Sequence, residues 1–169
     1  MDQSYFFTPE GEDFEWFYAQ HNVSILDNGD IALFDNGTAK VKRVDGDNRV
    51  SGDNVYSRAV VYQIDTENMT VSQVTEYGKE RGADWYSDWI SGVVSLDGTQ
   101  DHLWITAGSH LHSDEENRSD YYPKDMFVQG LTKTTHIDQV DNGELSFELT
   151  ISGDTYNALT YRSFRMPLY

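Results

Sequence analysis

The sequence contains no cysteine and only three prolines among its 169 residues. The absence of cysteine excludes disulfide bonds, thiolate metal sites and cysteine catalysis, and it leaves the redox compartment open. The scarcity of proline argues against a proline-rich linker. No stretch is long and apolar enough to span a bilayer, and the opening MDQSYFFTPEGEDF lacks the basic and apolar regions of a signal peptide. We therefore expect one domain-sized chain without membrane insertion.

Positive charge is also scarce, since 12 basic residues face 29 acidic ones and the formal net charge is -17. A nucleic-acid-binding protein would carry a basic stripe, and the sequence has none. The same imbalance disfavours binding to anionic membrane surfaces. An anionic small molecule would need a local group of donors, because distant charge is screened beyond roughly 8 Å at physiological salt.

Short β-rich runs separated by Asp, Asn and Gly dominate the sequence, and no convincing amphipathic helix interrupts them. Asn36-Gly37 suits a tight hairpin, and 38–55 and 109–124 are predicted as loops. The predicted strands are 21–25, 31–34, 58–64, 69–77, 89–96, 102–107, 133–140, 144–151 and 158–165.

These strands indicate an all-β fold built from two antiparallel four-stranded units, at about 14–78 and 86–152, with a closing strand at about 157–169. The segments YQIDTENMTVSQVTEYG and THIDQVDNGELSFELTI repeat one pattern of Ile-Asp, turn and alternating apolar residues. Such repetition is typical of β-propeller blades, and an antiparallel sandwich is the alternative. Two blades and a strand cannot close a ring. We therefore expect a fragment or one part of an assembly, in which a homodimer could cover the exposed sheet faces.

His21 is the candidate nucleophile. It follows an aromatic segment, FEWFY at 14–18, and opens a predicted strand, where a side chain can face a central pocket. Neutral imidazole is a good nucleophile near neutral pH. From the residues alone, a half-buried strand histidine with a backbone partner is the more common alternative.

Arg58, Tyr86 and Ser91 are the candidate substrate-binding residues. The guanidinium fork of arginine suits sulfate or phosphate oxygens, although salt bridges are its commoner use. Tyr86 and Ser91 offer hydroxyl donors beside Trp85 and Trp89, whose indole rings could stack on an aryl group or could simply pack in the core.

No metal or other cofactor is predicted. His110 and His112, with the acidic residues at 114–116, match no strong ligand spacing, and an exposed acidic loop is the better interpretation. The stretch Asp45-Gly46-Asp47-Asn48 hints at calcium but lacks the pattern of an EF-hand loop. No phosphate-binding glycine loop or serine-hydrolase motif is present.

Three segments resemble the C-terminal region of bacterial aryl-sulfate sulfotransferases. They are QHNVSILDNGDIALFDNG at 20–37, YSRAVVYQIDTENMTVSQVTEYGKERGADWYS at 56–87 and the closing YRSFRMPLY at 161–169. The middle segment is long and specific, and the resemblance covers most of the chain.

The resemblance implies that residues 1–169 are the C-terminal part of a six-bladed propeller that is periplasmic or extracellular. It implies transfer of a sulfuryl group from an aryl sulfate to a phenol, without a metal, through a sulfated histidine that matches His21. Ser91 is the nearest match to a hydroxyl residue of the family. Other substrate-contacting residues of the family lie in earlier blades, so we expect the isolated chain to be inactive. The alternative is a non-catalytic propeller or binding module for aromatic ligands.

Overall fold

A computed structural model describes residues 5–38, 55–87, 89–112, 132–153 and 159–166, apart from the side chains of 111 and 112. Within these ranges the chain forms nine strands and one short 3-10 helix. The strands make two sheets that are antiparallel except at one pair. The predicted all-β class is therefore confirmed.

The first sheet contains five strands in the spatial order β1-β5-β4-β3-β2. Strands β2 to β5 form an antiparallel meander, and β1 pairs in parallel with β5 through Thr8↔Thr70 to Glu10↔Ser72. The strands are β1 (Thr8–Glu10), β2 (Gln20–Ile25), β3 (Ile31–Asp35), β4 (Arg58–Asp65) and β5 (Thr70–Tyr77).

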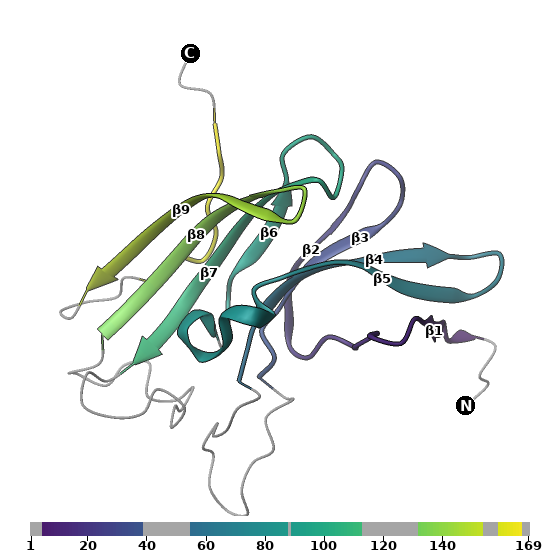
Figure 1. Ribbon diagram of the computed structural model, residues 1–169, viewed down its shortest axis with the longest axis horizontal. Coiled ribbons are helices and arrows are strands. Elements are labelled where there is room, and N and C mark those ends of the chain that lie inside the picture. Colours follow the sequence, from purple (N-terminus) through teal and green to yellow (C-terminus); the bar gives the residue numbers. More distant parts are fainter. Residues whose placement is uncertain (1–4, 39–54, 88, 113–131, 154–158, 167–169) are drawn as a thin grey trace, which may run out of the picture.

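The second sheet is a four-stranded antiparallel meander in the order β6-β7-β8-β9. The 3-10 helix η2 (Lys79–Trp85) connects the two sheets. Figure 1 shows the sheets side by side, and β6 contacts both β2 and β3. The strands are β6 (Gly92–Ser95), β7 (His102–His112), β8 (Thr132–Asp141) and β9 (Glu144–Gly153).

Three sequence-based boundaries are wrong. The strand predicted at 89–96 begins only at Gly92, because Ile90 and Ser91 have φ angles of 53° and 88°. Strand β7 runs past 107 to His112, because it keeps pairing with β8 as far as Thr132. The predicted strand at 158–165 is absent over the described residues 159–165. β1 and η2 were not predicted.

One apolar core joins the two sheets. Phe34 of β3 packs against Trp85 of η2 with ring centroids 5.5 Å apart, and the same cluster includes Val93 and Ile105 of the second sheet. The other face of the first sheet has its own cluster around Leu33, against which residues of the segment 14–17 pack. The described sheets do not close into a ring.

Strand β9 leaves a row of apolar side chains on the surface. Alternate residues along it are each between 42% and 45% exposed. Side chains two residues apart share one face of a strand, so these four form a continuous apolar stripe. They are Leu145, Phe147, Leu149 and Ile151.

The carboxylate of Asp138 on β8 joins the second sheet to the segment that leaves the first. It is fully buried and accepts hydrogen bonds from Tyr77 Oη at 3.1 Å, Arg81 at 2.8 Å and Trp85 Nε1 at 3.0 Å. Burial raises the pKa of Asp138 to about 6.

We predict that Asp138→Ala lowers the free energy of unfolding by about 2–4 kcal/mol, because two buried donors, Tyr77 and Trp85, and the half-buried cation Arg81 lose an acceptor. Urea denaturation followed by tryptophan fluorescence measures the change. Glu144→Ala, which removes an exposed carboxylate at the start of β9, is the control and should change stability by less than about 0.5 kcal/mol. Equal effects of the two variants would contradict this role of Asp138.

The raised pKa of Asp138 also predicts a pH dependence. The folded state binds the carboxyl proton of Asp138 more tightly than the unfolded state does. The resulting contribution to the free energy of unfolding is present below about pH 4 and is lost as pH rises through about 6. Asp138→Asn cannot titrate. Its stability relative to the parent should therefore rise by up to about 3 kcal/mol between pH 4 and 7, as determined by urea denaturation at each pH. A stability difference between Asp138→Asn and the parent that does not change with pH would contradict the raised pKa of Asp138.

Candidate functional site

His21 lies at the start of β2, where the strand is irregular. It pairs with Phe34, and a β-bulge separates this pair from the next one at Ser24. Asn22, inside the bulge, has a φ of 52° and donates from Nδ2 to the carbonyl oxygen of Val93 on β6 at 2.7 Å. The half-buried imidazole is thus fixed where the two sheets meet.

Asn36 is the main partner of His21. Its side chain is fully buried, and its Oδ1 lies 2.6 Å from His21 Nδ1. The Nδ2 group donates to the carbonyl oxygens of Ser87 at 2.6 Å and Ile90 at 3.0 Å. Ser57 Oγ donates to the backbone carbonyl of Asn36 at 2.9 Å. One amide therefore connects the histidine to the loop that precedes β6.

Buried serine hydroxyls hold that loop against β7. Ser87 Oγ and Ser91 Oγ lie 2.8 Å apart. Each accepts a backbone N–H from the bulge in β7, Ser91 from Gly108 at 3.0 Å and Ser87 from Ser109 at 2.9 Å. The loop is consequently fixed from both sides by hydrogen bonds that are shielded from water.

The same loop carries backbone strain. Ile90 is β-branched and buried, yet its φ is 53°, and Ser91 follows with a φ of 88°. A left-handed conformation costs such residues of the order of 1–3 kcal/mol each and persists only where the surroundings enforce it. Here the enforced conformation directs the Ile90 carbonyl oxygen toward Asn36 Nδ2, from which it accepts a hydrogen bond. Strain of this kind is commonly found at functional sites.

Two of the three predicted substrate-binding residues lie in or beside this cluster. Ser91 belongs to it, but its hydroxyl already bonds to Ser87 and Gly108. Tyr86 is buried, and its carbonyl oxygen lies 2.9 Å from His110 Nδ1. Their contact with substrate stays a prediction.

Arg58 lies outside the cluster, in an ion-pair network of the first sheet. It is fully buried, and all five N–H groups of its guanidinium can be matched with protein acceptors, which favours a structural role. The network holds the segment 14–18 that leads into β2. The acceptors are Asp35 at 3.0 Å, Gln73 at 2.9 Å, Glu76, the Glu15 carbonyl at 2.9 Å and Tyr62 Oη at 3.2 Å.

Asn36 was missed as a functional residue, because the sequence Asn-Gly indicated only a hairpin. Gly37 does adopt a turn conformation, with a φ of 71°, but the next strand, β4, begins only at Arg58, 21 residues after Gly37. The Trp89 indole N–H is buried and has no hydrogen-bond acceptor in the described part of the chain. Only the loop conformation reveals either feature.

Most of the predicted metal candidates lie outside the described residues. The stretch Asp45-Gly46-Asp47-Asn48 and the acidic residues 114–116 lie outside the described residues, as does the side chain of His112. Among the residues that are described, no three His, Cys, Asp or Glu side chains gather in a metal-binding group.

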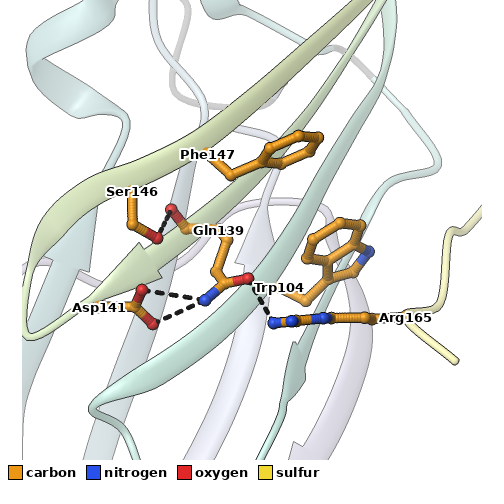
Figure 2. Close-up of a pocket in the computed structure, with 6 residues that line it drawn as sticks. All are labelled: Trp104, Gln139, Asp141, Ser146, Phe147 and Arg165. Carbon is orange, nitrogen blue, oxygen red and sulfur yellow. Dashed lines mark hydrogen bonds between the residues drawn. The ribbon is translucent and has the colours of Figure 1, made fainter. Parts of the chain in front are cut away.

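A surface cleft of about 510 Å³ lies on the second sheet (Figure 2), and His21 is not among the residues that line it. Trp104 and Phe147 stack in it with ring centroids 5.8 Å apart. Gln139 donates to both oxygens of Asp141 and accepts from Arg165 at 2.7 Å. The polar groups of the cleft therefore bond to one another, and none of its lining residues is a predicted site residue.

The fold and site define an all-β protein in which a buried amide holds a half-buried histidine at the junction of two sheets. The chain belongs to the arylsulfotransferase family (ASST), whose sequence model matches residues 1–162. The family resemblance of the sequence is thereby confirmed.

Two curated relatives carry the name arylsulfate sulfotransferase AssT. The protein from Escherichia coli is 34% identical over 156 residues, and the one from Lelliottia amnigena is 29% identical over 156 residues. Each match covers 91% of this chain but only 23% of the relative. The chain thus corresponds to about a quarter of these proteins. No helix of the described residues is long and apolar enough to cross a membrane.

The contacts of Arg58 predict that Arg58→Lys lowers the free energy of unfolding by about 1–3 kcal/mol, because an ammonium group cannot reproduce the five-donor fork. Urea denaturation measures the change, with the exposed Arg165→Lys as control. Unchanged stability together with weaker binding of aryl sulfate would instead favour direct contact with substrate.

Proposed function

We propose that His21 is the nucleophile of an aryl-sulfate sulfotransferase, which moves a sulfuryl group from an aryl sulfate to a phenol through a sulfohistidine. Membership of the arylsulfotransferase family supports the substrate class. The observation that carries the role of His21 is its 2.6 Å hydrogen bond to a fully buried amide at the junction of the sheets. A held imidazole with one nitrogen left for reaction is the arrangement that nucleophilic catalysis requires.

The reaction has two half-reactions. In the first, a ring nitrogen of His21 forms a bond to sulfur while the S–O bond to the aryl group breaks, and its electron pair leaves with the phenolate. In the second, the oxygen of an acceptor phenol attacks sulfur and gives up its proton to water, and the N–S electron pair returns to the ring. Protonation of the departing phenolate would assist the first step. The scheme uses no metal or other cofactor.

The oxygens of the transferred group gather negative charge and need fixed donors. We assign the unpaired Trp89 indole N–H to this task, since it is a buried donor in the strained loop. Ser91 and Tyr86 shape the same loop, whereas Arg58 acts through the segment that precedes His21.

The two sheets are proposed to be blades of a six-bladed propeller, in a periplasmic or extracellular protein. The antiparallel meanders β2–β5 and β6–β9 have the strand order of blades, and the apolar stripe on β9 is suited to packing against a further blade. The chain spans 23% of its relatives. We therefore expect it to need additional blades for turnover.

The test uses the intact protein, meaning this chain together with the additional blades proposed above. In it, His21→Ala should reduce release of nitrophenol from p-nitrophenyl sulfate, with phenol as acceptor, by at least about a hundredfold, because the covalent route is lost. Mass spectrometry of the parent protein should find an acid-labile sulfuryl group on the peptide that contains His21. His102→Ala, which alters an exposed histidine, is the control.

Undiminished turnover in His21→Ala would contradict the proposal. Binding of aryl sulfate without any trapped sulfuryl group would instead favour a non-catalytic module for aromatic ligands.

A further inference from the structure

The hydrogen bonds of Asn36 determine which way its amide points. Its Nδ2 lies 2.6 Å from the carbonyl oxygen of Ser87 and 3.0 Å from that of Ile90. Carbonyl oxygens only accept hydrogen bonds, so the NH₂ group must face them. Oδ1 consequently faces His21 Nδ1, 2.6 Å away. Because Oδ1 also only accepts, Nδ1 must carry the hydrogen of that bond.

We infer that Asn36 is a positioning residue that holds His21 as its Nδ1–H tautomer and so leaves the reactive lone pair on Nε2. The role of this tautomer in catalysis rests on the proposed function. In the opposite tautomer, lone pairs of Nδ1 and Oδ1 would face each other at 2.6 Å, and a protonated Nε2 could not attack sulfur. Nε2 is thus the atom that forms the N–S bond.

Hydrogen bonds prevent the side-chain amide of Asn36 from rotating into the flipped orientation. A flip would set Oδ1 against the carbonyl oxygens of Ser87 and Ile90, so a fully buried residue would lose both hydrogen bonds that its Nδ2 donates. Ser57 Oγ also bonds to the carbonyl oxygens of Asn36 and Ser87, at 2.9 and 3.1 Å. The tautomer is therefore set by the fold before any substrate binds.

An amide serves this reaction better than a carboxylate would. The proton on Nδ1 stays in place through both half-reactions, and the sulfated ring is a cation that still donates to Asn36 Oδ1. Removal of that proton would leave a sulfated ring without positive charge, which would have to depart as the imidazolate anion and so leaves far less readily. A neutral amide oxygen is too weak a base to take the proton. It also provides the two donors that the loop carbonyls need, which a carboxylate cannot do.

Nitrogen-15 NMR of the full chain tests the assignment without any turnover. Long-range proton–nitrogen correlations of the His21 ring, at a pH where the imidazole is neutral, distinguish a protonated from an unprotonated Nε2. We expect an unprotonated Nε2 in the parent protein. A protonated Nε2 would overturn the inference, whatever the catalytic activity.

Two variants separate positioning from simple support of the loop. Asn36→Ala and Asn36→Asp both lose the bonds to the Ser87 and Ile90 carbonyls, and both should lower the melting temperature. Only Asn36→Ala loses the acceptor for Nδ1–H. We expect a mixed tautomer in Asn36→Ala and the parental tautomer in Asn36→Asp. In the intact protein, kcat should be at least about tenfold lower in Asn36→Ala than in Asn36→Asp.

The exposed Asn68→Ala is the matched control and should leave the His21 spectrum unchanged. Equal tautomer populations and equal kcat in the two Asn36 variants would overturn the inference. If Asn36→Ala does not fold, the parent and Asn36→Asp spectra still decide it, since both must show an unprotonated Nε2. A parental spectrum as expected, combined with full activity of His21→Ala, would refute the proposed nucleophile and leave the tautomer assignment standing.

Discussion

The arrangement of the site depends on one buried amide. Asn36 directly follows β3, accepts a hydrogen bond from His21 Nδ1 and donates to two carbonyl oxygens of the strained loop before β6. Because these partners come from both sides of the sheet junction, the histidine cannot shift relative to the loop without breaking a buried hydrogen bond. The conformation of Ile90 is maintained by the same bonds that orient the imidazole. Strain and nucleophile are therefore parts of one unit.

The buried and half-buried ion pairs lie beside the cluster of His21, Asn36 and the strained loop, and they do not include its residues. The buried cation Arg58 is matched by Asp35 and Glu76, and Arg81 is matched by Asp138 and Glu148. The contacts made by His21, Ser87 and Ser91 in the described residues are to neutral groups. In an acidic chain, neutral partners keep the histidine from pairing with a carboxylate.

Local patterns in the sequence predicted the strands well but predicted the site only in part. β2, β3 and β4 were located closely because short alternating runs lie between strong turn residues. β1 was missed because its parallel pairing with β5 is a long-range contact, and the loop at Ile90 was read as strand because propensity favours isoleucine there. Apart from Tyr62, the acceptors of Arg58 lie between 15 and 43 residues away in sequence, so only the fold brings them together.

The two sheets end differently, and this difference bears on self-association. β1 covers part of the outer edge of β5, at residues 70–72, whereas β9 is the last strand of its sheet over the whole described length from 144 to 153. Unpaired backbone groups on an outer strand are a template for another chain. Two copies that pair through antiparallel β9 strands would be related by a twofold axis. The outer edge of β9 would then be paired in both copies. Growth through the β9 edge would therefore stop at the pair.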